Sequence, residues 1–186
     1  MDKRSRGRNL ISIKKHNRAV ILNILRQHGP ISRAEIARIS KLTPPTVSNL
    51  VSELVVSEFV REVGAGDSTP NGGRRPTLLM LNPQARYVVG IKIGVDLLTA
   101  VLTDLEGKIL HRAQATRVAG EDAGAVATRL AGLIQTLLNQ SNLRRERLLG
   151  VGVASSGVVD SEKGVVRRSS LLQWQEAPIA RLIQER

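Results

Sequence analysis

Small polar side chains recur in one short stretch of this sequence at the spacing of a single helix face. Pro45 precedes Ser48 and Asn49 by three and four residues, Ser52 follows them by four and three, and Thr46 stands beside them. A narrow helix face with hydroxyl and amide groups can enter the major groove of B-DNA and hydrogen-bond to base edges. A solvated helix with only a structural role usually shows long charged side chains instead. These residues are therefore candidates for base contacts in double-stranded DNA.

A second group of candidate residues lies near the end of a loop that is rich in glycine, proline and polar residues. Arg74 and Arg75 end the segment GAGDSTPNGGRRP, and residues 59–63 and 77–81 on either side are predicted to be antiparallel strands. Arginines at the tip of such a hairpin, or wing, are favoured in a narrow minor groove because its potential is negative. The alternative is that the two arginines are ordinary solvated charge.

Start and stop signals predict three helices that would position these residues. The first covers residues 17–28, a capping box of Ser32 and Glu35 begins the second, and Thr43 can cap the third. Arg33, in the first turn of the second helix, completes the candidate DNA contacts. The third helix has an apolar stripe, predicted to be buried, of Val47, Leu50, Val51 and Leu54. Two short helices with a tight connection form a helix-turn-helix.

Charge and composition favour a polyanionic partner and exclude other classes of site. The net charge is +12, and residues 1–82, with 14 basic and 6 acidic side chains, carry +8 of it. Aromatic residues are too few for the stacking platforms that bind single strands. The absence of cysteine and the wide separation of the three histidines predict no metal site, and no cofactor is expected. Without a signal peptide or an apolar membrane-spanning run, a soluble cytoplasmic protein with no membrane partner is expected.

From residue 83 onward the pattern changes to that of a mixed sheet. An amphipathic helix is predicted over 122–140, and a buried strand follows over 148–154. Three meandering strands are predicted before this helix, over 87–95, 97–102 and 108–115. This order resembles the small lobe of the actin-like, ribonuclease-H-like sugar kinase fold.

Both parts of the chain resemble the ROK family of repressors, open reading frames and kinases. The first part matches through HNRAVILNILRQHGPISRAEIARISKLTPPTVSNLVSELVVSEFVREVG and GGRRPTLLMLNP. The second matches through GIKIGVDLLTAVLTDLEGKIL, LLGVGVASSGVVDSEKGVV and SSLLQWQEAPIARLI. The resemblance implies a sequence-specific repressor of sugar-utilisation genes whose partner is a double-stranded DNA operator. It leaves open a homo-oligomer as a further partner, and a sugar effector for a full-length relative.

The fold class expected is α+β, in two parts. Residues 1–15 are expected to be a basic flexible arm or a frayed first helix, and residues 16–82 a winged helix-turn-helix. Residues 83–186 are expected to be a partial actin-like/ribonuclease-H-like α/β lobe, the first part of the ROK sugar-binding domain. The family's Asn-Asp pair and its cysteine-rich zinc site have no counterpart here, so the expectation is a fragment, a degraded gene product or a naturally short regulator.

Two family motifs are altered where ligands would bind. Kinases of the family carry Asp-x-Gly-Gly-Thr at a phosphate-binding turn, whereas this chain has Asp96-Leu97-Leu98-Thr99. Two leucine side chains are expected to fill the place of a phosphate, so neither ATP binding nor a catalytic residue is expected. The Pro-Gly turn of the family's sugar pocket is Ser-Ser-Gly here, which leaves Gly157 as the carried-over sugar contact. Trp174 is expected to be a packing residue, and Gly150 and Gly152 to mark a close strand approach.

The alternatives to a repressor are an ATP-dependent sugar kinase and a non-specific DNA-binding protein. The kinase needs a phosphate loop, and a non-specific binder needs only Lys and Arg rather than the polar face at Asn49. Because most of the family's sugar pocket has no counterpart, sugars are not expected to release the chain from DNA. The strands after residue 82 are expected to be poorly buried and open to proteolysis.

Overall fold

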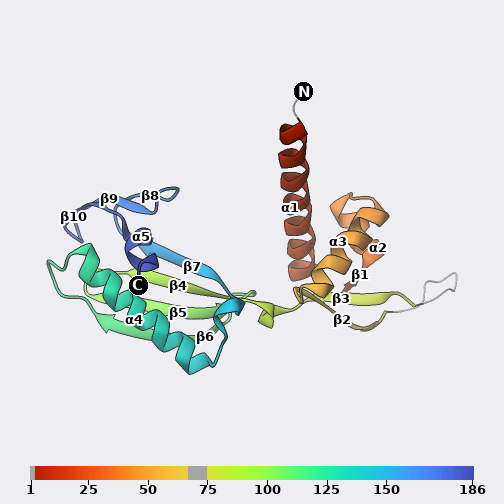
Figure 1. The fold of residues 1–186 in the computed structure, drawn as a ribbon. Helices are drawn as coiled ribbons and strands as arrows, with labels where there is room; N and C mark the ends of the chain where they lie inside the picture. The colour runs from red at the N-terminus through yellow and green to blue at the C-terminus, as the bar shows by residue number, and fades with distance from the viewer. Residues whose placement is uncertain (1–2, 67–74) are drawn as a thin grey trace. The chain divides into compact units, whose positions relative to one another are not determined.

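A computed structural model of the chain describes residues 3–66 and 75–186 (Figure 1). The chain divides into two compact units, Met1–Pro83 and Gln84–Arg186. The division therefore falls one residue beyond the boundary that the sequence predicts.

The first unit combines three helices with a small antiparallel sheet. Its helices are α1 (Lys3–His28), α2 (Arg33–Ser40) and α3 (Pro44–Val56). Its strands are β1 (Ile31–Ser32), β2 (Val60–Ala65) and β3 (Thr77–Leu81), in the order β1-β3-β2. The predicted helices and the β2–β3 hairpin are confirmed. The sequence does not reveal β1, because two residues are too few to show an alternation.

The first helix is longer than the sequence predicts. Of the two alternatives for the N-terminal residues, the structure has the helix and not the flexible arm, because α1 is continuous from Lys3. Lysine and arginine are good helix formers, and an ion pair of 2.6 Å between Lys14 Nζ and Glu53 Oε1 ties this half of α1 to α3. Ile11 and Ile13 are 60% and 51% exposed, so burial of apolar side chains does not stabilise the helix at these two residues.

The predicted capping interactions of α2 and α3 are present. The Ser32 hydroxyl accepts a hydrogen bond from the Glu35 N–H at 3.3 Å, and the Glu35 carboxylate accepts one from the Ser32 N–H at 2.9 Å. Thr43 Oγ1 accepts from the Thr46 N–H at the start of α3. Aliphatic side chains form the core of the unit: Ile21, Ile24, Leu25, Ile31, Ile36, Val47, Leu50, Val51, Leu54, Val60, Leu79 and Leu81. Each such side chain stabilises the fold by roughly 1.5–3 kcal/mol through its removal from water.

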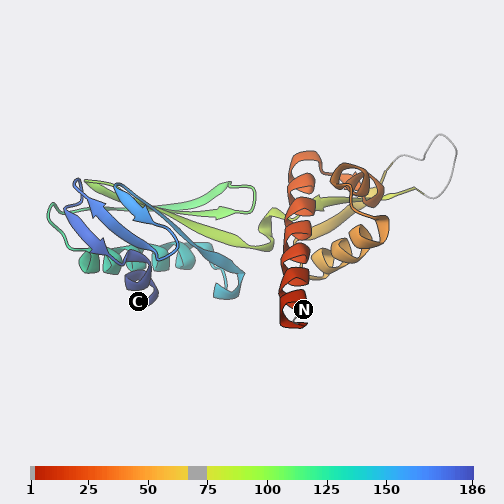
Figure 2. The same ribbon diagram turned by 90° about the horizontal axis from the view of Figure 1, so that it is seen from above.

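The second unit is built on a four-stranded sheet. Its strands are β4 (Tyr87–Ile93), β5 (Leu97–Asp104), β6 (Ile109–Thr116) and β7 (Leu148–Ser155), in the order β6-β5-β4-β7. Strand β7 runs parallel to β4, and the other neighbours are antiparallel. Helix α4 (Ala123–Ser141) lies along one face of this sheet (Figure 2). These are the predicted elements in the predicted order.

A second, smaller sheet follows β7. Its strands are β8 (Val158–Asp160), β9 (Val165–Ser169) and β10 (Trp174–Ala177), and helix α5 (Ile179–Gln184) comes after them. Short 3-10 helices occupy Pro83–Ala85 and Arg145–Arg147. The sequence does not predict the strands of this sheet, because three to five residues give little periodic signal.

Two expectations about the second unit are wrong at β7. The strand is not buried, since Leu149 and Val151 are 55% and 38% exposed. The reason is its place at the edge of the sheet, with β4 as its neighbour among the described residues. An added Cβ at Gly150 or Gly152 would meet no atom within 4 Å, so these glycines do not mark a close strand approach.

The remaining core of the second unit is better packed than expected. Apolar side chains of β4, β5 and α4 form one buried cluster that includes Val89, Ile91, Leu102, Leu130 and Leu137. Poor burial is found in β7 and also in β6 and β8, where Ile109 and Val158 are 48% and 67% exposed. No helix among residues 3–66 and 75–186 is long and apolar enough to cross a membrane.

Candidate nucleic-acid interface

Helix α3 presents a buried apolar stripe and an exposed polar face, as the sequence predicts. Val47 and Leu54 are fully buried in the core of the first unit. Pro45, Ser48 and Asn49 are exposed, and so is Ser52 one turn further along the helix. The structure thus brings four of the candidate DNA contacts onto one open helix face.

The first turn of α3 has few backbone donors to offer a phosphate. Pro44 and Pro45 are its first two residues and carry no N–H. The Thr46 N–H donates to Thr43 Oγ1 at 3.4 Å, and the Val47 N–H donates to the Thr43 carbonyl oxygen at 3.0 Å. Phosphates near this end must therefore be bound by side chains.

Intramolecular hydrogen bonds distinguish the polar side chains of this face from one another. The Ser52 hydroxyl donates to the Ser48 carbonyl oxygen at 2.9 Å, and the hydroxyls of Thr43 and Thr46 are 2.8 Å apart. Within the described part of the chain, the side chains of Ser48 and Asn49 make no hydrogen bond. Asn49 carries both an amide donor and a carbonyl acceptor, the pair of groups that matches the major-groove edge of adenine.

Arg33 stands apart from this face, at the start of α2. Its guanidinium Nη2 lies 3.4 Å from Glu62 Oε1 of β2, and the two side chains are 34% and 51% exposed. An exposed ion pair contributes roughly 0–1 kcal/mol, so Arg33 can exchange Glu62 for a phosphate at little cost. Sequence reasoning missed Glu62, because the contact forms only when the hairpin packs beside α2.

The wing is confirmed as an antiparallel hairpin. Its register runs from the Val60–Leu81 pair to the Ala65–Thr77 pair, with a bulge between Glu62 and Gly64. Gly64 has a φ of +131°, which a residue with a side chain rarely adopts. Arg74 lies outside the described residues. Arg75 begins the described return segment and is exposed.

A cavity in the second unit lies at the carboxyl ends of the parallel strands β4 and β7. Its volume is about 470 Å³ and its lining consists of Lys92, Ile93, Gly94, Val95, Ala154, Ser155 and Ser156. Such strand ends are the usual place for ligands in open α/β sheets. Gly157 follows directly, with a φ of +110°, and a Cβ there would collide with the Arg168 carbonyl oxygen. This glycine is thus required by the close approach of β9, and its sugar contact stays a prediction.

The phosphate-binding prediction needs a correction at the turn beside this cavity. The turn between β4 and β5 is closed by a hydrogen bond of 3.0 Å from the Gly94 N–H to the Leu97 carbonyl oxygen. Leu98 points into the core and is fully buried. Of the two leucines, only Leu97 has an exposed side chain at this turn, with 41% of it accessible.

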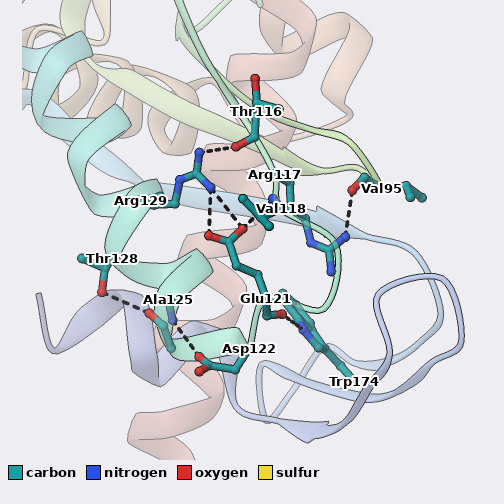
Figure 3. Close-up of polar contacts among 11 residues, drawn as sticks. Val95, Thr116, Arg117, Val118, Glu121, Asp122, Ala125, Thr128, Arg129 and Trp174 are labelled. Carbon is teal, nitrogen blue, oxygen red and sulfur yellow. Dashed lines mark hydrogen bonds and ion pairs between the residues drawn. The ribbon is translucent and has the colours of Figure 1, made fainter.

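A buried arginine contacts this turn and lies beside Trp174 of the second sheet (Figure 3). Arg117 is 5% exposed and donates to the carbonyl oxygens of Val95 at 2.8 Å and Leu172 at 3.2 Å. Its guanidinium lies 5.9 Å from the ring centroid of Trp174, whose indole N–H donates to the Glu121 carbonyl oxygen at 2.9 Å. Trp174 is therefore a packing residue, as predicted.

Glu121 is the anionic member of this cluster. Its carboxylate accepts hydrogen bonds from the Val118 N–H at 3.0 Å and from Arg129 at 2.8 and 3.1 Å. The Val118 hydrogen bond, followed by that of Arg129, holds the pKa of Glu121 below its usual range. Among residues 3–66 and 75–186, no group of three acidic or histidine side chains is placed to hold a metal ion.

The sequence model of the ROK family matches residues 88–186, which is more than half of the chain. The chain belongs to the ROK family. The model of the MarR family matches residues 15–62, a range that includes α2 and α3. Each match lies within one unit of the fold: the MarR match in the first unit and the ROK match in the second.

Curated relatives of this ROK chain are regulators by name. The xylose repressor of Bacillus subtilis (strain 168) is 32% identical over 174 residues, which cover 94% of this chain and 44% of the relative. The xylose repressor of Caldicellulosiruptor bescii is 31% identical, with coverages of 94% and 43%. The DNA-binding transcriptional dual regulator NagC of Escherichia coli (strain K12) is 28% identical, with coverages of 96% and 43%. The chain thus spans less than half the length of these relatives.

A solved structure supports the fold of both units. The crystal structure of a ROK family transcriptional regulator, a homologue of the Escherichia coli MLC protein, has a TM-score of 0.76 to this chain. The likeness covers 93% of this chain and 43% of that one, at 22% identity. It confirms the expected succession of a winged helix-turn-helix and a ROK α/β lobe.

Proposed function

We propose that this chain binds double-stranded DNA sequence-specifically and represses genes for sugar uptake or breakdown. The exposed face of α3 carries this proposal. Over a fully buried apolar stripe it presents Pro45, Ser48, Asn49 and Ser52, side chains short enough for close entry into a major groove. In the sequence, Arg74 and Arg75 come shortly before β3, the second strand of the wing.

The polar face favours a specific regulator over a non-specific DNA-binding protein. Base edges are read by hydrogen bonds, whereas phosphates need only cations. Asn49 is uncharged and exposed, and its side chain makes no hydrogen bond to the rest of the described chain. The net charge of +8 over residues 1–82 then supplies affinity that does not depend on sequence.

The link to sugar genes rests on the relatives, which include xylose repressors and an N-acetylglucosamine repressor. Self-association belongs to the proposal as a further partner, and a sugar effector is proposed for a full-length relative. Dimeric helix-turn-helix proteins bind two half-sites about one helical turn apart. An inverted repeat in the bound DNA would therefore support self-association.

Sugar kinase activity is not part of the proposal. At the turn beside the β4–β7 cavity, Leu97 exposes an apolar side chain, which offers a phosphate no hydrogen bond. The β4–β5 turn is tight, because a Cβ on Gly94 would lie 2.7 Å from the Leu97 carbonyl oxygen. We therefore expect this chain to act without ATP.

Selection of DNA from a random duplex library by the purified full chain tests the function. A regulator is expected to enrich a defined motif over successive rounds, and a reporter gene placed behind that motif should be repressed when the chain is produced. Binding without enrichment would favour the non-specific alternative. An absence of binding at low salt would contradict DNA recognition altogether.

A further inference from the structure

We propose that residues 11–18 of α1 form a second, sequence-independent contact with the DNA backbone, beside the base-reading face of α3. This inference rests on the proposed function and adds a binding segment to the helix-turn-helix and the wing.

The charge of α1 is of one sign throughout. The helix contains eight Lys and Arg residues and no Asp or Glu, and seven of the eight fall within residues 3–18. Cations spaced three or four residues apart on a helix repel one another unless an anion lies beside them. A second copy of this helix would add like charge, whereas a row of phosphates has the complementary sign.

The helix face that carries two of these cations is turned toward the rest of the unit. Arg18, Ile21 and Leu25 follow Lys14 at intervals of four, three and four residues, which places them on one face. Ile21 and Leu25 are 0% and 3% exposed in the core. One face of α1 is therefore apolar and packed in the core at Ile21 and Leu25, and the same face is cationic further towards the N-terminus, at Lys14 and Arg18.

An ion pair places this cationic segment beside the reading face of α3. Lys14 Nζ lies 2.6 Å from Glu53 Oε1, and the two side chains are 53% and 42% exposed. Glu53 follows Asn49 by four residues, so the two are neighbours on the surface of α3. Lys14 therefore stands about one helical turn from the side chain proposed to read a base.

The negative charge of Glu53 has to be offset by a cation if α3 is to approach DNA. A carboxylate one turn from a base-reading residue lies near the phosphates that flank the groove, and like charges at such a distance repel. The Lys14 ammonium has three donors, so it can bind Glu53 and a phosphate together. Arg18, one turn further along α1, is half-buried and continues the cationic face.

Salt dependence of binding to a random-sequence duplex, followed by fluorescence anisotropy, tests the contact. Each phosphate contact contributes about 0.9 to the slope of log affinity against log salt. Lys14→Gln and Arg18→Gln should each lower the slope by about 0.9, and Lys14→Arg should keep it. Glu53→Gln should tighten binding at low salt, because it removes a repulsive charge. Glutamine is close to lysine and arginine in helix propensity, so α1 should persist.

Two matched variants separate this contact from a general effect of charge. Arg26→Gln removes a cation from the other end of α1, and Glu106→Gln removes an exposed anion from the second unit. Both should bind as the unaltered chain does. Unchanged slopes for Lys14→Gln and Arg18→Gln would overturn the inference, as would equal tightening by Glu106→Gln and Glu53→Gln. A chain that does not bind the duplex at all would contradict the proposed function instead.

Discussion

On the outer face of α3, the polar side chains differ in how much hydrogen-bonding capacity is left for a ligand. The Ser52 hydroxyl already donates to the Ser48 carbonyl oxygen at 2.9 Å, and the hydroxyls of Thr46 and Thr43 are hydrogen-bonded to each other. The amide of Asn49 is exposed and uncharged. The residue types in the sequence are sufficient to predict that this face of α3 is polar. They do not show which of its side chains already make hydrogen bonds within the protein, because that depends on rotamers and on carbonyl groups one turn away.

Asn49→Ala should weaken binding to the selected duplex by about 1–3 kcal/mol and relax the preference at one base pair. The reason is the loss of an amide that can donate to and accept from one base edge. Competition binding against duplexes altered at single positions measures both effects. Asn23→Ala, an exposed asparagine of α1, is the control and should leave affinity unchanged. An equal loss on random DNA would show that Asn49 contacts only phosphate.

Ser32→Ala should destabilise the first unit by about 1 kcal/mol at neutral pH, because α2 loses its N-terminal cap. Hydrogen bonds from the backbone and the hydroxyl of Ser32 also lower the pKa of Glu35. A carboxyl with a lowered pKa stabilises the fold above its unfolded pKa, about 4.3 for glutamate, and this is lost as pH falls through the folded pKa.

Urea unfolding at neutral and acidic pH tests this account of the cap. The unaltered chain should lose stability across that acidic range, and Ser32→Ala should lose less, because part of the pKa shift has gone. Ser12→Ala, at an exposed position of α1, should match the unaltered chain throughout. An identical pH dependence for Ser32→Ala would contradict the capping box as the source of the shift.

At the scale of elements, signals confined to neighbouring residues were sufficient for α2, α3 and the wing. A cap, a proline and an apolar stripe are local features, and each predicts its element directly. The elements that could not be predicted depend on distant residues. Strand β1 exists because Ile31 and Ser32 pair with Leu79 and Leu78. The first half of α1 is tied to the fold at Lys14 by Glu53, which lies 39 residues further along the chain.

Alanine at both Arg74 and Arg75 should lower the salt slope of DNA binding by roughly 1–2 units. The expected cause is the loss of one or two phosphate or minor-groove contacts from the wing. Lys108→Ala with Arg112→Ala removes two exposed cations from the second unit and is the matched control. A slope equal to that of the unaltered chain would place the wing away from DNA.

At the scale of the whole molecule, the order of units and the main sheet follow from the sequence, whereas the burial of β7 does not. An apolar run such as Leu148 to Val153 looks the same at the centre of a sheet and at its edge. Only the strand order β6-β5-β4-β7 shows that it is an edge. The role of Gly157 likewise depends on the return of β9, eleven residues later in the chain at Arg168.

The second unit should resist limited proteolysis better than its sequence suggests. Its core includes Tyr87, Leu98, Leu130 and Trp174, all less than 10% exposed, and Arg117 joins two of its loops. A fragment that begins near Gln84 should therefore persist after brief digestion and be identified by mass spectrometry. Degradation of everything beyond residue 82 would show that the lobe does not pack as described.

Titration calorimetry with ATP should give no binding heat, because the β4–β5 turn is tight and the exposed Leu97 stands where kinases of the family carry a glycine. Leu97→Gly is the informative variant, since it removes the exposed apolar side chain. Measurable ATP binding by the unaltered chain would restore the kinase alternative.

The central claim is that α3 reads a DNA sequence, and the ratio of two affinities tests it most directly. The full chain would be titrated, at one salt concentration, with the duplex enriched by selection and with a scrambled duplex of equal length and composition. Specific regulators typically bind their own site at least about 10³-fold more tightly than other DNA. The account predicts a ratio of this order that falls by about 5- to 150-fold in Asn49→Ala, as expected for the loss of about 1–3 kcal/mol at one base pair. Equal affinities for the two duplexes would contradict it.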